Sequence, residues 1–402
     1  MRNRQEVKGL PAVVRDAATA ASRIGQTDDG ERRTCITFRD YMELCLYHPE
    51  FGYYRSGSSR VGREGDFYTS AYVGDIMGEQ LAERLTSLAD EHFGPEERVE
   101  VIDWGGGTGR LSRHMLEAWS RSSNPIAGAG RMSITVADRN PAHRALAEES
   151  LADWIGSGRA RVVDPDRQWP WSDGKGGADV GDAERGKSPV IIVANELLDA
   201  FPVHRLTCLN GGLLEQGVAW DEEKERPVAC LTELSDPRLA AWLEREGLAL
   251  AEHQMIEISI DAASWIGSLP GRFERAILVL IDYGDESEEL ISSHRMEGTL
   301  MCYFRHQAHD DPFIHLGEQD ITAHVNFSIL RKEAKASGWR EIWYGSQKRF
   351  LVESGLLEKL VAHTVTDPFH PTVRRNRAIR QLLLSDGMSE LFKVQIWEKT
   401  RT

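Results

Sequence analysis

The sequence lacks long hydrophobic runs and has few cysteines. Its aliphatic runs, such as residues 276–281, have the length of a strand and are far shorter than a membrane helix. Cysteine occurs only at Cys35, Cys45, Cys208, Cys230 and Cys302, without a C-x-x-C pair, so neither a disulfide framework nor a zinc site is expected. The first residues lack the apolar segment of a secretory signal. We therefore expect no membrane insertion and a cytoplasmic location, with the mitochondrial matrix as the alternative.

The chain also lacks an excess of positive charge. Lysine and arginine number 48 against 63 aspartates and glutamates, and the net charge is −15. Such a surface repels phosphate backbones and anionic lipids, so no nucleic-acid partner is expected, whereas a basic protein substrate would suit it. The 402 residues, 41% of them hydrophobic, can fill the core of a large α/β domain with insertions. Nothing in the composition indicates an oligomeric state.

A glycine-rich loop stands at the centre of the chain. An apolar strand ends at Asp103, alternate glycines follow at Gly105, Gly107 and Gly109, and a helical pattern begins near Leu111. The loop lacks both the G-x-G-x-x-G spacing of dinucleotide sites and the Lys-Ser/Thr pair of a P-loop. Its D-x-G-x-G-x-G spacing instead fits the S-adenosylmethionine loop of class I methyltransferases. A plain strand-to-helix turn is the alternative.

Two further stretches would belong to the same cofactor site. Asp138 closes the next apolar run, 132–137, where a second strand-end acid is expected to hold the ribose hydroxyls. Asp66 and Thr69 lie among aromatics on a loop before the cofactor strand and could form a lid over the ligand. A capped turn with its aromatics in the core is the alternative for that loop.

Candidate catalytic groups follow the apolar strand 190–194. Asn195, Glu196 and Asp199 come directly after it, and parallel strands present their carboxyl ends to one crevice, so we expect these side chains near the glycine loop. An acid that caps a helix start is the alternative for Asp199. The stretch 305–326 holds four histidines and several aspartates, but their spacing lies on no convincing helix. We expect a polar loop there and no metal.

The pattern of elements predicts an α/β chain with a mostly parallel central sheet, an N-terminal helical extension and a substrate-side insertion. Asn210-Gly211-Gly212 predicts a hairpin turn, and Asp236-Pro237 predicts a helix start. The expected segments are a flexible N-terminus (1–33), a helical lid region (34–95), a cofactor-binding half (96–206), the insertion (207–275) and the rest of the sheet (276–402).

Seven motifs in one order resemble those of the MidA-like family, which includes a mitochondrial complex I assembly methyltransferase. They are Gly52-Tyr53-Tyr54, Gly65-Asp66-Phe67-Tyr68-Thr69, the glycine loop from Asp103, Asn195–Pro202, Ile281–Gly284, Gly298-Thr299-Leu300 and Asp320–Val325. The resemblance covers the chain from about residue 38 to its end. It implies a Rossmann-like class I fold, S-adenosyl-L-methionine as cofactor and protein arginine as the methyl acceptor.

If the acceptor is arginine, its protonated guanidinium must be held by carboxylates that also take up a proton. Glu196 and Asp199 are the candidates for this role, with Asn195 as a hydrogen-bond donor and His324 or Asp66 as further possibilities. Two other functions stay open. The protein could methylate oxygen or nitrogen on a small molecule, or it could be an assembly factor that binds the cofactor without turnover.

Overall fold

The structure is a computed structural model that describes residues 8–55, 75–121, 130–167, 188–384 and 388–399. The chain divides into two compact units, each assembled from separate stretches. Unit 1 comprises residues 1–56, 198–265 and 284–332, and unit 2 comprises residues 57–197, 266–283 and 333–402. None of the helices in the described ranges combines the length and the apolar character needed to cross a bilayer.

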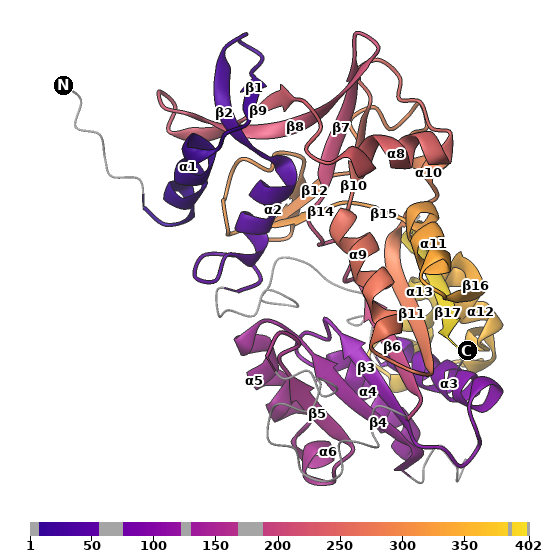
Figure 1. Cartoon of the computed structure of the whole chain (residues 1–402). Coiled ribbons are helices and arrows are strands. Elements are labelled where there is room, and N and C mark those ends of the chain that lie inside the picture. Colours follow the sequence, from indigo (N-terminus) through magenta and orange to yellow (C-terminus); the bar gives the residue numbers. More distant parts are fainter. Residues whose placement is uncertain (1–7, 56–74, 122–129, 168–187, 385–387, 400–402) are drawn as a thin grey trace. The chain divides into compact units, whose positions relative to one another are not determined.

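Unit 2 is built on a mainly parallel sheet with the strand order β16-β17-β11-β6-β3-β4-β5 (Figure 1). The parallel strands are β3 (Val99–Trp104), β4 (Met132–Ala137), β5 (Ala160–Val163), β6 (Val190–Asn195) and β11 (Ala276–Asp285). The antiparallel strands β17 (Phe392–Lys399) and β16 (Arg340–Ser346) extend it on one side. The central strands are apolar and buried because both faces of the sheet are covered. The predicted α/β architecture is confirmed.

Helices cover this sheet within unit 2. They are α3 (Ile76–His92), α4 (Arg110–Arg121), α5 (Pro141–Ser150), α6 (Ala152–Gly156), η3 (Leu269–Gly271), α12 (Gln347–Glu353), η4 (Leu356–Lys359), α13 (Pro371–Leu384) and α14 (Met388–Leu391). Trp119 of α4 donates its indole N–H to the Ala82 carbonyl of α3 at 3.0 Å. Gly78 of α3 faces Cβ of His114, where an added methyl would lie only 2.3 Å away. The small residue therefore lets the two helices approach closely.

Unit 1 contains a small antiparallel ring of strands. β8 (Gly212–Asp221) pairs with β2 (Arg32–Thr37) and β9 (Arg226–Thr232), and β1 (Ile24–Gln26) pairs with β2 and β9 to close the ring. β7 (His204–Leu209) and β10 (Met255–Ile258) extend the sheet beyond β8. The predicted hairpin is confirmed, because Asn210 and Gly211 join β7 to β8 with φ values of 53° and 73°.

The remaining elements of unit 1 are short. They are α1 (Leu10–Ala20), α2 (Phe38–Tyr47), α8 (Pro237–Glu246), α10 (Ser287–Leu290), β12 (Met301–Phe304), β13 (Gln307–His309), β14 (Asp320–Thr322) and β15 (Val325–Asn326). The predicted start of α8 is confirmed, since the Asp236 side chain accepts a hydrogen bond from the Arg238 amide. Two helices, α9 (Ile260–Ser268) and α11 (Phe327–Ala336), have residues in both units.

Two local stretches differ from the prediction. After α1 the chain forms a hairpin, because β1 and β2 pair from Ile24 opposite Thr34. The described part of the segment expected to be flexible thus holds α1, β1 and the first residues of β2. The polar loop expected from Arg305 to Asn326 contains β13, β14 and β15, whose pairing partners β12 and β11 lie elsewhere in the sequence. A short strand whose pairing partner lies far away in the chain has too few residues to show a recognisable sequence pattern.

The compact units also differ from the predicted segments. The expected helical region 34–95 divides between α2 in unit 1 and α3 in unit 2, and residues 284–332 of the expected final sheet segment belong to unit 1. The chain passes repeatedly between the two units, so boundaries drawn along the sequence do not coincide with divisions in space.

Candidate functional site

The glycines of the loop after β3 have distinct roles. Gly105, Gly107 and Gly109 all have positive φ, at 73°, 55° and 71°, a region that disfavours any side chain. A Cβ on Gly105 would lie 2.8 Å from the Leu197 side chain, and one on Gly109 would lie 3.1 Å from Ala147. A Cβ on Gly107 would meet nothing within 4 Å. Gly105 and Gly109 therefore permit packing, while Gly107 borders open space that a ligand can enter.

Asp103 lies beneath this loop. It is only 2% exposed, and its Oδ2 accepts a hydrogen bond from the Ser112 hydroxyl at 2.6 Å. Burial raises the pKa of Asp103 to about 6; the Ser112 hydrogen bond opposes this rise, and the charge of Asp138 adds to it. A Cβ on Gly106 would lie 2.8 Å from Cγ of Asp103, so the glycine allows the loop to close over the carboxylate.

Asp138 connects the loop to the end of β4. Its Oδ2 accepts a hydrogen bond from the Gly107 amide at 2.9 Å, and its Oδ1 accepts one from the Asn140 amide at 2.7 Å. Asn140 in turn caps α5 through its side-chain oxygen. Asp103, the three predicted glycines and Asp138 thus come together in one part of unit 2.

The turn after β6 packs on the same loop through Leu197. Asn195 donates from its side-chain nitrogen to Oε1 of Glu196 at 3.1 Å. Glu196 has a φ of 53°, which is uncommon for a residue with a side chain and costs roughly 1–2 kcal/mol. Two hydrogen bonds hold this backbone: the Glu196 amide donates to the Ile281 carbonyl at 2.8 Å, and the Leu197 amide donates to Oδ2 of Asp282 at 3.1 Å.

Asp199 belongs to a different cluster, within unit 1. Its carbonyl oxygen accepts from the Ala323 amide at 3.0 Å. Asp320 precedes Ala323 by three residues, and its Oδ1 accepts from the Tyr54 hydroxyl at 2.8 Å. Asp199 and Asp320 are 6% and 2% exposed. Burial raises the pKa of Tyr54 well above its usual value of 10, and the charges of Asp320 and Asp199 raise it further. The same three causes, in the same order, raise the pKa of Tyr303.

The predicted catalytic trio is therefore divided between the units. Asn195 and Glu196 belong to unit 2, whereas Asp199 belongs to unit 1. Asp199 does not begin a helix, because the chain forms a turn at residues 199–200 and enters β7 at His204. Asp66 and Thr69 lie outside the described residues, so their predicted contribution to the cofactor site stays a prediction.

Sequence reasoning gave no role to Asp282, Ser112 or Asp320 in these sites. Asp282 is 1% exposed and directly follows the apolar run of β11, much as Asp103 follows the apolar run of β3, and that repeated pattern could have identified it. Asp320 was part of a recognised motif, but its position near Asp199 depends on long-range packing. Ser112 carried no distinct signal.

The histidines of residues 305–326 lie among aromatic and basic side chains. The ring of His315 stacks on Phe304 with centroids 3.9 Å apart, and Nδ1 of His324 lies 3.2 Å from the Arg295 guanidinium. Among the residues that the structure describes, no three His, Cys, Asp or Glu side chains converge as metal ligands.

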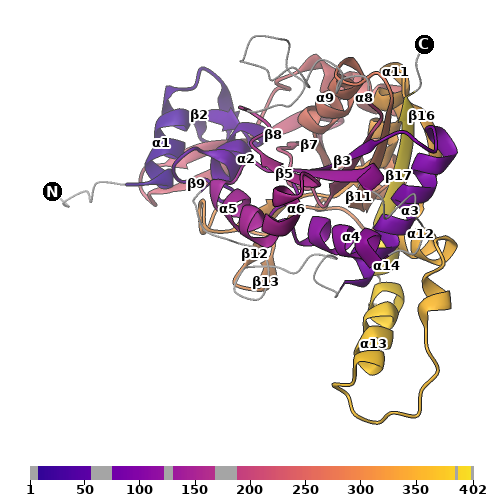
Figure 2. The same ribbon diagram turned by 90° about the horizontal axis from the view of Figure 1, so that it is seen from below.

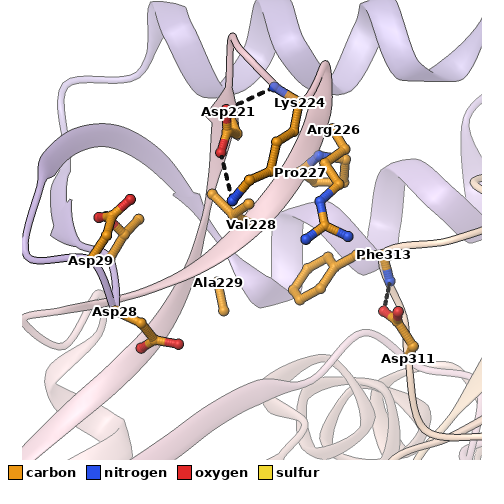
Figure 3. A pocket seen from close by; sticks show the side chains of 11 residues that line it. Asp28, Asp29, Asp221, Lys224, Arg226, Pro227, Val228, Ala229, Asp311 and Phe313 are labelled. Carbon is orange, nitrogen blue, oxygen red and sulfur yellow. Dashed lines mark hydrogen bonds and ion pairs between the residues drawn. The ribbon is translucent and has the colours of Figure 1, made fainter.

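A separate hollow of about 360 Å³ lies in unit 1 (Figure 3). Its walls come from the turn between β1 and β2, the hairpin between β8 and β9, and Asp311 with Phe313. The Asp221 carboxylate there accepts hydrogen bonds from the amides of its own hairpin and pairs with Lys224 at 3.5 Å. Of the predicted site residues that lie in the described ranges, none lines this hollow.

The model of a family described as putative S-adenosyl-L-methionine-dependent methyltransferase matches residues 76–345. The Drosophila melanogaster protein arginine methyltransferase NDUFAF7 homolog, mitochondrial, is 25% identical over 352 residues, which cover 83% of this chain and 75% of that protein. Its Danio rerio counterpart is 26% identical over 339 residues, covering 80% of this chain and 73% of the relative.

Solved structures give a closer overall match. A Burkholderia thailandensis protein crystallised with S-adenosyl-homocysteine is 27% identical and superimposes with a TM-score of 0.79, covering 99% of this chain and 96% of that one. A second crystal structure from that organism, in native form, gives a TM-score of 0.77 at the same identity and coverage.

Proposed function

This chain belongs to the S-adenosyl-L-methionine-dependent methyltransferase family, and from that premise we propose that it methylates arginine side chains of a protein substrate. Membership of the family gives the reaction class and the cofactor. The acceptor and the residues that bind each group are our proposal, argued from unit 2 for the cofactor and from unit 1 for the acceptor.

The glycine loop has the features that S-adenosylmethionine requires. The open space beside Gly107 leaves room for a ligand to lie against the backbone, and the loop leads into the N-terminus of α4, where amide groups point outward. We propose that Asp138 accepts hydrogen bonds from the ribose hydroxyls and that Asp103, together with the glycines, completes the site. When bound, S-adenosylmethionine supplies a methyl group already activated by its sulfonium.

The single observation that favours arginine is the pair of buried carboxylates in unit 1. Both carboxylates act on the same tyrosine, Tyr54, and a cation bound near a buried carboxylate lowers the cost of its charge. A guanidinium can form paired hydrogen bonds with carboxylates, and tyrosine hydroxyls such as that of Tyr54 can fix the orientation of the acids. Asp199 and Asp320 therefore suit an arginine side chain better than a neutral acceptor.

The protein's own groups then have two tasks. Since the sulfonium methyl is already activated, the chief requirement is to align the acceptor nitrogen. A protonated guanidinium must also lose a proton, which a nearby carboxylate can accept. We propose that Asp199 and Asp320 bind the guanidinium, and that Glu196, oriented by Asn195, is the acidic group beside the cofactor loop.

Calorimetric titration with S-adenosylmethionine tests the cofactor site. Gly107→Arg should abolish binding because its side chain fills the space beside the loop. Gly158→Arg is a matched control: Gly158 also has a positive φ, at 74°, and no atom lies within 4 Å of its Cβ position. Equal loss of binding in both variants, or normal binding by Gly107→Arg, would refute the assignment.

A second assay tests the acceptor. The protein and S-adenosylmethionine labelled in its methyl group are added to a cell extract, and methylated arginine is sought by mass spectrometry. Asp320→Asn should lose transfer while retaining cofactor affinity, and the exposed Asp310→Asn should retain both. Label on small molecules alone would favour the small-molecule methyltransferase. Binding without any transfer would favour an assembly factor that does not turn over.

We also propose a cytoplasmic location, with the mitochondrial matrix as the alternative. All five cysteines are free, which suits a reducing compartment such as the cytoplasm. The relatives from Drosophila melanogaster and Danio rerio are named as mitochondrial proteins, and this supports the alternative. Fractionation of cells that express the tagged chain tests this proposal.

A further inference from the structure

Two buried thiols meet inside the strand ring of unit 1. Cys35 of β2 and Cys230 of β9 both lie on strands that pair with β8, where they are opposite Ala219 and Gly217. Figures 1 and 2 show β2, β8 and β9 next to one another. Cys35, Ala219 and Cys230 form one small apolar cluster, and both thiols are free. The ring thus brings together two cysteines that are far apart in the sequence.

Two glycines make room for the sulfur atoms. A Cβ on Gly217 of β8 would lie 3.0 Å from Sγ of Cys230 and 3.1 Å from Sγ of Cys35. A Cβ on Gly25 of β1 would lie 3.0 Å from Sγ of Cys35 and closer still to Sγ of Cys230. The two sulfur atoms are therefore close neighbours, because each lies near the same two points.

The two thiols differ in acidity. A hydrogen bond with the Cys230 thiol lowers the pKa of Cys35; burial opposes this effect, and the charge of Arg23 adds to it. The same hydrogen bond raises the pKa of Cys230, and burial raises it further. Since the thiolate is the reactive form of cysteine, Cys35 is the better nucleophile of the pair, and Cys230 lies where it can react with a group formed on Cys35.

The hollow of unit 1 borders this cluster. Val228 of β9 lines the hollow (Figure 3) and also packs against the two thiols and Ala219. Hydrogen peroxide is small and uncharged, so it can enter a hollow lined by charged side chains such as Asp221 and Lys224 without being repelled. A small oxidant therefore has a place to approach the pair.

We propose that Cys35 and Cys230 form a reversible thiol–disulfide site, which hydrogen peroxide oxidises and small thiols such as glutathione reduce. The disulfide adds a covalent link between the hairpin of β1 and β2 and the hairpin of β8 and β9. In a reducing compartment such a bond forms transiently, so the free thiols are the resting state.

The chemistry balances in two steps. The sulfur of Cys35 attacks one peroxide oxygen, the O–O bond breaks, and a sulfenic acid forms while the departing hydroxide takes the thiol proton and leaves as water. The sulfur of Cys230 then attacks the sulfenic sulfur, the S–S bond forms, and the hydroxyl group leaves with the Cys230 proton as a second water. Two thiols give up two electrons to the peroxide, and thiol exchange through a mixed disulfide returns them.

Peptide mapping after mild oxidation tests the pairing. In a Cys208→Ser background, which removes the one native thiol that is not buried, the folded chain is treated with hydrogen peroxide, blocked with N-ethylmaleimide in denaturant and digested. We expect linked peptides that contain Cys35 and Cys230, and a link that dithiothreitol breaks. Cys45 and Cys302 should stay reduced, because burial raises the pKa of both thiols. The absence of the link, or equal oxidation of Cys45 and Cys302, overturns the proposal.

Two controls connect this result to the fold. Oxidation in concentrated urea should lose the preference for Cys35 and Cys230, because an unfolded chain does not hold them together. The linked chain should also unfold at a higher urea concentration than the reduced chain, since the bond restricts the unfolded state. The same preference in urea, or an equal or lower unfolding midpoint after oxidation, contradicts a site built by the ring.

Single variants test the order of the two steps. Cys230→Ser should leave the sulfenic acid of Cys35 to be labelled by dimedone, whereas Cys35→Ser should give about tenfold less label on Cys230. Circular dichroism checks that both variants fold. Equal labelling of the two variants, or stronger labelling of Cys230, refutes the assignment of Cys35 as the attacking thiol.

Discussion

Replacing Asp103 by asparagine should make the protein more stable at pH 8 and should lower its affinity for S-adenosylmethionine. Burial raises the pKa of this carboxyl to about 6 from its ordinary 3.8, so the charged form is disfavoured in the folded state. One pH unit of such a shift corresponds to about 1.4 kcal/mol, and the charge therefore costs about 3 kcal/mol of folding free energy once both states are ionised.

The sign of the pH dependence follows from proton binding. Between pH 3.8 and about 6 the folded protein keeps a proton that the unfolded chain has lost, so stability falls as pH rises through this window. Asparagine carries no charge at any pH, and its oxygen can still accept from the Ser112 hydroxyl. Its amide N–H group needs a new partner, which offsets about 1–2 kcal/mol. A net gain of about 1–2 kcal/mol is expected at pH 8.

Urea unfolding of the variant and of the natural chain at pH 8 and pH 5 measures this difference. The advantage of the variant should shrink by about 1.5 kcal/mol at pH 5, since the natural carboxyl is then largely protonated in the folded state. Ser112→Ala is the control with the opposite sign: it removes a donor to the charged carboxylate and should lower stability at pH 8. If Asp103→Asn lowers stability at pH 8, or if its effect is the same at both pH values, the burial argument is wrong.

Three further results are expected. Asp138→Asn should weaken S-adenosylmethionine binding about tenfold or more in calorimetry, because it replaces the charged acceptor beside the Gly107 amide; unchanged affinity would exclude a cofactor role. Tyr54→Phe should lower the free energy of unfolding by about 1–3 kcal/mol, since it removes a donor to the buried Asp320 carboxylate. Thermal melting measures this loss, and an unchanged melting temperature would contradict it. Gly106→Ala should destabilise the fold by about 1–3 kcal/mol through crowding of the carboxylate beneath it, whereas a melting temperature equal to that of the natural chain would show that the loop can shift.

Much of unit 2 was predictable from the sequence because its signals are local. The apolar strands, the glycines with positive φ and the helix that follows them depend on residues close together in the chain, and the order β3, loop, α4 follows from them. The hairpin at Asn210 and the capped start of α8 were predictable for the same reason. The family resemblance then fixed the reaction class.

The tertiary structure alone decided which distant residues meet. Asn195 and Glu196 are near neighbours of Asp199 in sequence, yet Asp199 belongs to the other unit, where it lies with Asp320 and Tyr54. The ring formed by β1, β2, β8 and β9 is likewise invisible in the sequence, because β1 is three residues long and depends on partners on both sides. Local preference specifies a turn or a strand, but the neighbours of a buried carboxylate are set by the packing of segments more than a hundred residues apart.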